Sequence, residues 1–177
     1  MGFSRTPIRE ALRRLEQEGL AERRDGAGLF VAELTGQGAT EIIAIRSLLE
    51  GYAARLAAER VTEVELDAIR QAHADAGRAI ADGDLDKLLD ANARFHDGIK
   101  SASHSDRCVS MISELRDWIL RFRVQALGET AARQRTYQQH EQILAALEQG
   151  NGPLAEEVTR THIDDSMKGV IERLLND

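Results

Sequence analysis

Three histidines could act together as ligands of a metal ion, although they lie far apart in the chain. His96, His140 and His162 fall on three different predicted helices, and each lies on or beside the apolar face of its helix. Asn92 precedes His96 by one helical turn, so the two side chains project from the same face. Facing helices of a bundle can assemble a metal site from such inward side chains. Three imidazoles and one oxygen ligand suit Zn²⁺, Ni²⁺ or a similar divalent ion.

Two other interpretations of these histidines need to be weighed. Each ring could be a core histidine whose nitrogens are satisfied by hydrogen bonds, which for one histidine alone is the commoner situation. A three-histidine site with an open position can also activate water, as in a metalloenzyme. Only Asp90, Asp164 or Asp165 would offer such an enzyme a general base, and the sequence has no nucleophile elbow or phosphate loop. His73, near an apolar stripe, and His104, in a predicted loop, match no motif and are interpreted as structural or surface residues.

Six amphipathic helices are predicted to carry these side chains. Apolar residues recur at three- and four-residue steps through most of the chain after residue 38. Turn sequences at 82–84 and 150–153 separate neighbouring helices. Helices joined by such short loops favour an antiparallel bundle, which is an all-α fold. The predicted helices span residues 39–59, 62–82, 84–101, 105–127, 131–149 and 152–175.

The composition agrees with a globular helical protein. Apolar residues make up 42% and aromatic residues only 4%, whereas alanine, leucine, glutamate and arginine, which favour helices, are abundant. The sequence has no apolar run of about 18 residues that could cross a membrane and no signal peptide. The single cysteine, Cys108, cannot form an internal disulfide. We therefore expect a cytoplasmic protein.

The N-terminal residues are predicted to form a separate small unit. Ser4 can cap a helix that ends before Gly19, with arginines on the face opposite an apolar stripe. Two short extended runs around the glycine-rich turn 25–28 then predict a hairpin. Glycines near 33–38 indicate a linker. The predicted domains are residues 1–35 and residues 36–177.

Charge is distributed unevenly between these two parts. Residues 1–14 contain four arginines and one acidic residue, whereas residues 36–177 carry the entire net charge of −7. A basic N-terminal segment attached to an acidic domain is compatible with contact between that segment and phosphate groups.

Residues 2–20 resemble the recognition-helix region of the GntR family of winged helix-turn-helix regulators, through the run Ser-Arg-Thr-Pro-Ile-Arg-Glu-Ala-Leu at 4–12. Residues 23–31 follow at the family's usual distance and resemble its wing. The resemblance implies that a double-stranded DNA operator is bound, with Arg5 and Arg9 giving specificity and Ser4 and Arg13 positioning the helix. The alternative is a solvated charged helix face. The implied DNA-binding residues are Ser4, Arg5, Thr6, Arg9, Arg13 and Gly26.

The winged domain of that family normally begins with a further helix before this region. The apolar stripe of Ile8, Leu12 and Leu15 therefore lacks its usual packing partners, and the winged helix-turn-helix is partial. We expect residues 1–33 to be poorly packed or to be covered by a neighbouring chain. A metal-dependent dimer that has lost its DNA head is a further alternative.

Residues 45–58 resemble the first helix of the effector-binding FCD domain found in the FadR-type branch of the GntR family. Residues 89–96, 139–147 and 161–163 resemble later landmarks of that domain, in the same order. Many members carry aspartate where this chain has Asn92, whose neutral carbonyl is a weaker ligand than a carboxylate. The resemblance implies four metal ligands, namely Asn92, His96, His140 and His162.

The same resemblance implies that the metal anchors the carboxylate of a small organic acid. An arginine on the cavity wall can bind the acid's other oxygens, because its planar fork matches a carboxylate. Arg46 is the first candidate for this role, followed by Arg123 and Arg135. For each of these arginines the alternative is a surface ion pair.

These features together predict a metabolite-responsive transcription regulator, a repressor, rather than an enzyme. A homodimer would hold two recognition helices at the spacing of a palindromic operator. The effector would act through its different affinity for two states of the bundle, with the linker transmitting the change to the DNA-binding units. The alternative is a metal-dependent enzyme that uses the histidine cluster.

Overall fold

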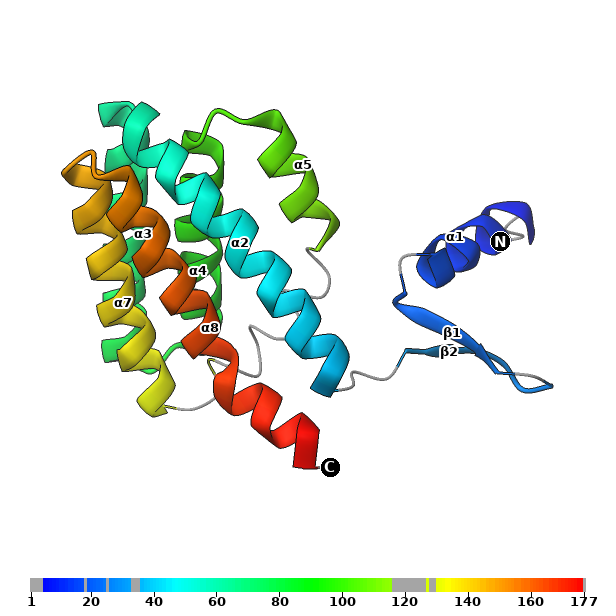
Figure 1. Cartoon of the computed structure of the whole chain (residues 1–177). Helices are drawn as coiled ribbons and strands as arrows, with labels where there is room; N and C mark the ends of the chain where they lie inside the picture. The colour runs from blue at the N-terminus through cyan, green and yellow to red at the C-terminus, as the bar shows by residue number, and fades with distance from the viewer. Residues whose placement is uncertain are drawn as a thin grey trace. The chain divides into compact units, whose positions relative to one another are not determined.

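Two units make up the chain in the computed structural model, which describes residues 5–17, 19–24, 26–32, 36–115, 127 and 130–176. The N-terminal unit is Met1–Thr35 and the helical unit is Gly36–Asp177 (Figure 1). Residues 33–35 of the predicted linker lie outside the described residues. Gly36 and Gly38, which were also predicted to belong to the linker, are instead part of the first helix of the helical unit.

The N-terminal unit consists of helix α1 (Arg5–Gln17) and a hairpin of strands β1 (Ala21–Arg24) and β2 (Gly28–Val31). The strands are antiparallel, with Ala21 opposite Val31. Gly19 follows the helix with φ of 71°, and Gly26 lies in the hairpin turn with φ of 75°. Both values are left-handed, a conformation that glycine adopts without steric cost. The predicted recognition helix and wing are therefore both present.

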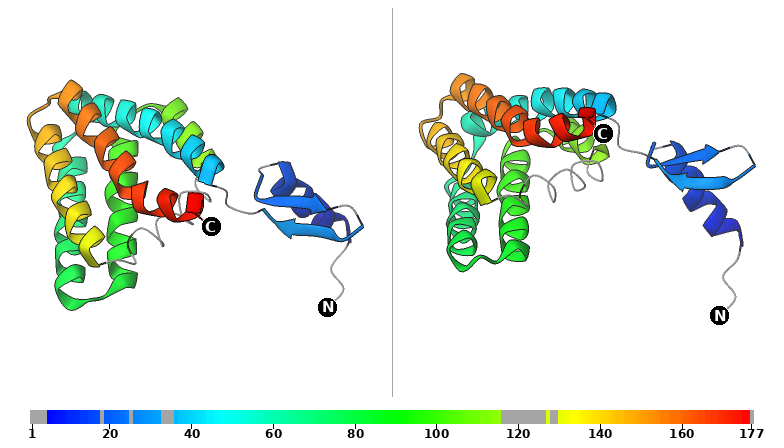
Figure 2. Two further views of the ribbon diagram at one scale, coloured as in Figure 1. Left: turned by 60° about the horizontal axis from the view of Figure 1, so that its bottom comes forward. Right: turned by 90° about the horizontal axis from the view of Figure 1, so that it is seen from below.

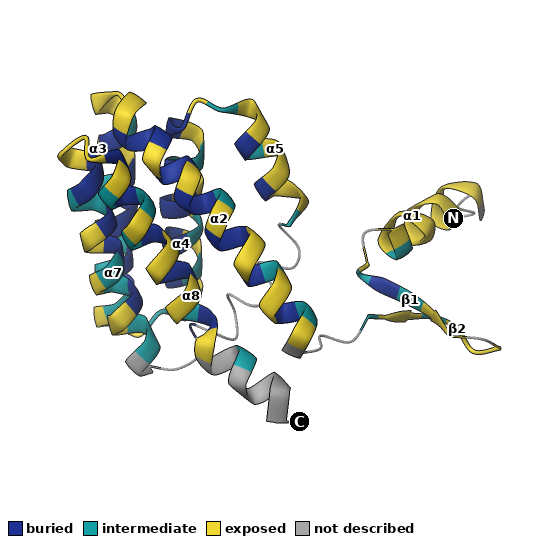
Figure 3. Ribbon diagram, in the orientation of Figure 1, coloured by how far each residue is buried: buried dark blue, intermediate teal, exposed yellow. Residues whose placement is uncertain are grey.

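The apolar stripe of α1 is largely uncovered in the described residues. Ile8 is 51% exposed, Leu12 42% and Leu15 38%. Most of α1 is coloured as exposed in Figure 3. Exposed stripes of this size on a helix are typical of surfaces that need a further element for cover. This agrees with the expectation that the winged unit is only partial.

The helical unit contains six helices among its described residues, which confirms the predicted all-α bundle (Figure 2). Helices that neighbour each other include α2 and α8, α3 and α4, and α7 and α8. No helix among the described residues is both long enough and apolar enough to cross a membrane. The helices are α2 (Gly36–Arg60), α3 (Glu63–Asp82), α4 (Leu85–Ala102), α5 (Asp106–Glu114), α7 (Thr130–Glu148) and α8 (Gly152–Asn176).

Polar side chains fix where several helices begin. Thr62 caps α3 in a capping box with Glu65, and Gly83 ends this helix with φ of 70°. The carboxylate of Asp84 accepts a hydrogen bond from the backbone N–H of Lys87 and so caps α4. Helix α5 is shorter than the predicted helix 105–127, since it ends at Glu114, and residues 116–126 lie outside the described residues.

The main core lies between α2, α3, α4, α7 and α8, and its buried residues include Phe95 and many aliphatic side chains. Figure 3 shows buried residues on the facing sides of these helices. Helices α2 and α8 approach each other closely within this core. A Cβ atom added to Gly51 would lie 2.5 Å from Cγ of Arg160, and Ser47 Oγ donates a hydrogen bond to the backbone oxygen of Arg160 at 3.4 Å. Small residues on α2 thus allow its backbone to lie directly against α8.

Candidate metal centre

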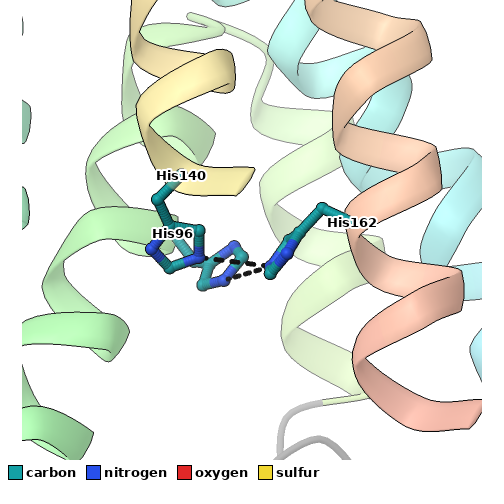
Figure 4. A group of neighbouring side chains, drawn as sticks. All are labelled: His96, His140 and His162. Carbon is teal, nitrogen blue, oxygen red and sulfur yellow. Dashed lines mark hydrogen bonds between the residues drawn. The ribbon is translucent and has the colours of Figure 1, made fainter. Parts of the chain in front are cut away.

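Three helices bring the three predicted histidines together inside the bundle. His96 comes from α4, His140 from α7 and His162 from α8, and all three are buried (Figure 4). The Nε2 atoms of His140 and His162 are 3.2 Å apart, and those of His162 and His96 are 3.4 Å apart. One nitrogen from each ring lies within 4.8 Å of those of the other two. Among the described residues this is the group of side chains whose geometry could hold a metal ion.

The outer nitrogen of His96 is engaged by Glu50 of α2. Its Nδ1 lies 3.2 Å from Oε2 of Glu50, while Oε1 of the same carboxylate accepts a hydrogen bond from Nε of Arg46 at 2.7 Å. An ionised carboxylate can only accept, so Nδ1 of His96 is the donor. In the neutral ring this leaves the lone pair on Nε2, which points toward the other two histidines.

The outer nitrogen of His162, Nδ1, is engaged by a second relay, that is, a second chain of hydrogen-bonded side chains like Arg46–Glu50–His96. Nδ1 of His162 lies 3.0 Å from Oε1 of Gln139. Nε2 of Gln139 donates to Oδ2 of Asp165 at 3.0 Å, which fixes the orientation of the amide with its oxygen toward the ring. Nδ1 of His162 is therefore also a donor, and its Nε2 likewise presents a lone pair to the cluster.

His140 is oriented by ring stacking. Its ring lies on Phe95, with 4.2 Å between ring centroids and 14° between the planes. This contact turns Nε2 of His140 toward His162. Aromatic contacts of this kind fix ring orientation as well as burying area.

The donor set fits a divalent transition metal. With Nδ1 protonated on His96 and His162, their Nε2 lone pairs face each other 3.4 Å apart, an arrangement that a shared cation turns from repulsive to favourable. Two nitrogens that are each about 2.0–2.1 Å from a tetrahedral zinc ion lie about 3.3–3.4 Å apart, close to both Nε2 separations. These two nitrogen pairs, His140 with His162 and His162 with His96, are therefore already at distances that suit such an ion.

Glu50 and Arg46 form a buried ion pair beside the cluster. Glu50 is 5% exposed and Arg46 is 4% exposed. Burial alone would raise the pKa of the Glu50 carboxyl, but the charge of Arg46 and the hydrogen bond from His96 hold this pKa well below its usual range. Glu50 is thus ionised at neutral pH, which is the state that the donor assignment of His96 requires.

A small cavity of about 20 Å³ adjoins the cluster. Asn92 and Arg46 both contribute to its wall, and Asn92 is 4% exposed. Arg135, in contrast, is exposed on α7 and is not among the described residues that line the pocket, and Arg123 lies outside the described residues. The wall is formed by Arg46, Asn92, His96, Leu127, Thr136, His162, Ser166 and Met167.

The predicted DNA-binding residues lie in the N-terminal unit. Thr6, Arg9 and Arg13 are exposed on α1, and Gly26 is exposed in the hairpin turn. Arg9 and Arg13 lie one turn apart and line the same hollow. Ser4 lies outside the described residues, as does the side chain of Arg5.

The two remaining histidines lie apart from the cluster. His73 is buried and stacks on Tyr137 with 4.2 Å between ring centroids, and burial lowers its pKa. His104 is exposed, and its Nε2 lies 2.9 Å from a carboxylate oxygen of Glu65.

Sequence reasoning missed two polar residues that contact the cluster, Glu50 and Gln139. Glu50 follows Arg46 by four residues, and both lie on the inward face of α2. A pair of opposite charges on an inward helix face indicates a buried ion pair, because charged side chains are seldom buried unless they are paired. Gln139 directly precedes His140 but contacts His162 on another helix, and nothing in the sequence pattern pointed to that contact.

Comparison with known families gives two matches. The family described as "FCD domain" matches residues 41–165, and "Bacterial regulatory proteins, gntR family" matches residues 1–31. The chain is 28% identical to the transcriptional regulator LutR of Bacillus subtilis, over 96% of this chain and 87% of that protein. It is 27% identical to the Uxu operon transcriptional regulator of Escherichia coli, over 97% of this chain and 74% of that protein.

Solved structures show the same fold. Escherichia coli McbR/YncC superposes with a TM-score of 0.75 at 24% identity, covering 99% of this chain and 87% of that one. A GntR family transcriptional regulator from Pseudomonas syringae superposes with a TM-score of 0.62 at 26% identity, covering 99% of this chain and 74% of that one.

The fold and these matches define a transcription regulator with a winged helix-turn-helix element and a helical effector-type domain. The chain belongs to the FadR-type branch of the GntR family, whose members carry the FCD domain. The matched families and relatives are transcription regulators and not enzymes, which decides against the metalloenzyme alternative.

Proposed function

We propose that this regulator is a repressor whose helical unit binds a divalent metal ion and a small organic acid that modulates operator binding. The observation that carries the proposal is the convergence of the Nε2 atoms of His96, His140 and His162. In His96 and His162 an acceptor oxygen engages Nδ1, so that Nε2 is the nitrogen that faces the cluster. The proposed ligands are His96, His140 and His162, with the carbonyl oxygen of Asn92 as the fourth. A bound cation would supply an electrophilic anchor for a carboxylate in the adjoining pocket.

Arg46 is the residue that we propose for the acid's other oxygens. It lines the pocket, and its guanidinium has donors beyond the Nε that Glu50 already accepts from. At about 20 Å³ the cavity beside the cluster is small, so we expect the acid to enter only when the surrounding helices move apart. Arg135 carries less support for this role because it is exposed and lies off the pocket wall.

The repressor role is supported by the description of a relative. A 29% identical protein of Paenarthrobacter nicotinovorans is described as a probable D-xylose utilization operon transcriptional repressor. A homodimer would present two copies of α1 to a palindromic double-stranded operator. Thr6, Arg9, Arg13 and Gly26 are the described residues that we propose for DNA contact.

The test combines metal analysis with operator binding. Purified protein is analysed for bound metal, and its binding to an operator selected from random DNA is followed by gel shift with a panel of hydroxy, keto and sugar acids. We expect His96→Ala and His140→Ala to lose both the metal and the response to the acid while keeping operator affinity. A response to the acid that survives in both variants would refute the metal-anchored mechanism, and His73→Ala is the matched control.

A further inference from the structure

Two residues outside the proposed ligand set control the direction in which the cluster's nitrogens point. Glu50 and Gln139 come from α2 and α7, and each accepts from Nδ1 of a histidine on a different helix. A histidine ring can present either nitrogen to a metal, and the hydrogen bond at one nitrogen decides which one is left for the ion. These two acceptors therefore select the nitrogen that faces the centre.

We propose that Glu50 and Gln139 are positioning residues that hold His96 and His162 in the Nδ1–H tautomer, with both Nε2 atoms ready to bind a metal. The proposal rests on the metal site proposed above. It assigns a role to residues that are not ligands themselves.

Each acceptor is held in place by a second group. Arg46 donates to Glu50 from the same helix at 2.7 Å, and Asp165 accepts from the amide of Gln139 at 3.0 Å. The relay Arg46–Glu50–His96 is buried throughout. The relay Asp165–Gln139–His162 is partly open to solvent, since Asp165 is exposed. Because hydrogen bonds to a charged acceptor are stronger when buried, Glu50 should have the larger effect.

The first test measures metal affinity with Co²⁺ and Zn²⁺ as the probes, by titration against a chromophoric chelator. Glu50→Gln keeps the shape of the side chain but leaves one acceptor oxygen for two donors, Arg46 and His96. We expect metal affinity to fall about 10–100-fold in Glu50→Gln, as is usual for the loss of such partners. Gln139→Leu should lose about tenfold.

Two controls separate positioning from folding. Ile112→Ala weakens the packing of α5 against α2 without touching the cluster, so it should lower Tm and leave metal affinity unchanged. If Glu50→Gln does not fold, the double variant Arg46→Met/Glu50→Met removes both buried charges together. This double variant should fold and should still bind metal at least about tenfold more weakly than the wild type.

The second test reads the tautomers directly in protein from which metal has been removed. Long-range ¹H–¹⁵N correlation spectra should show His96 and His162 protonated at Nδ1 in the wild type. Glu50→Gln should lose this signature at His96 only, and Gln139→Leu at His162 only. Unchanged tautomers and unchanged metal affinity in these variants would overturn the proposal. A wild-type protein that binds neither ion would instead overturn the metal site itself, whatever the tautomers show.

Discussion

At the scale of single residues, Asn92 stands where the family resemblance leads us to expect an aspartate in many members. Its side chain is buried on the pocket wall one turn before His96. A neutral amide oxygen attracts a divalent cation less than a carboxylate does. The proposed metal site would thus depend more heavily on its three imidazoles.

Replacing Asn92 with aspartate should strengthen metal binding. We expect Asn92→Asp to tighten Zn²⁺ binding on the order of tenfold, equal to about 1.4 kcal/mol. Without metal the same variant should be less stable than the wild type, because a new buried charge lacks a partner. Chelator competition and thermal melts in excess chelator would measure the two effects, and an unchanged Zn²⁺ affinity would show that position 92 is not a ligand.

Arg9 and Arg13 should differ in how they support DNA binding. We expect Arg9→Ala to weaken binding to a selected operator by about 1–3 kcal/mol and to relax sequence preference. Arg13→Ala should weaken binding to all sequences similarly and reduce the salt dependence by about one counterion. Fluorescence anisotropy at several salt concentrations, on selected and scrambled DNA, distinguishes the two. Equal losses of specificity in both variants would contradict this division of roles.

How much of the site could be predicted depends on whether its partners lie on one helix or on several. The inward faces of His96, His140 and His162 follow from helical periodicity, so their meeting in the core was predictable. The contacts of Glu50 and Gln139 were not, because each joins two helices whose rotation and register the sequence pattern leaves open. The exposure of Arg135 follows from periodicity within α7, since one helical step separates it from the buried Thr136.

At the scale of elements, the start of α3 is held by an acid-sensitive cap. Oε2 of Glu65 accepts from the backbone N–H of Thr62 at 2.9 Å and from its hydroxyl at 2.7 Å. These hydrogen bonds, with a smaller contribution from His104, lower the pKa of Glu65 from 4.5 to about 2. A carboxyl with a depressed pKa in the folded state stabilises the fold above its unfolded pKa and loses that effect as pH falls.

We therefore expect the free energy of unfolding to decline as pH falls from about 4.5 to about 2, in part because Glu65 takes up a proton. In Glu65→Gln this part of the decline should be absent. Urea unfolding at several pH values in this range measures it, with Glu63→Gln as a control on the same helical turn. Parallel pH profiles for Glu65→Gln and the wild type would rule out the capping carboxylate as a cause. The partial exposure of Glu65 keeps the effect modest.

Element boundaries were predicted well where a cap is local. Gly83 and Gly150 are both left-handed, as the turn sequences indicated, and the predicted helices on either side of them agree with α3, α4, α7 and α8. The start of α2 was placed too late, because Gly36 and Gly38 are poor helix formers that local propensity assigns to a linker. Packing of the long helix against α8 overrides that preference.

At the scale of the whole molecule, metal binding should be visible as stability. A ligand at a hundredfold excess over its Kd adds about 2.7 kcal/mol, which raises Tm by about 5–10 °C for a chain of this size. We expect Zn²⁺ to raise Tm of the wild type by this amount and a chelator to reverse the shift. Scanning calorimetry on the wild type and His140→Ala gives the comparison. The same rise in the variant would mean that Zn²⁺ stabilises the chain elsewhere.

Gly51 has no side chain, and its absence brings α2 into close contact with α8. At Gly51 the backbone of α2 lies against the side chain of Arg160 and the backbone oxygen of Glu156, both on α8, with no side chain of its own in between. His162 lies on that same α8, within one helical turn of Arg160. We expect a displacement of α8 near His162 to reach α2 through this contact, and α2 is the helix whose first residue, Gly36, follows the N-terminal unit in the chain.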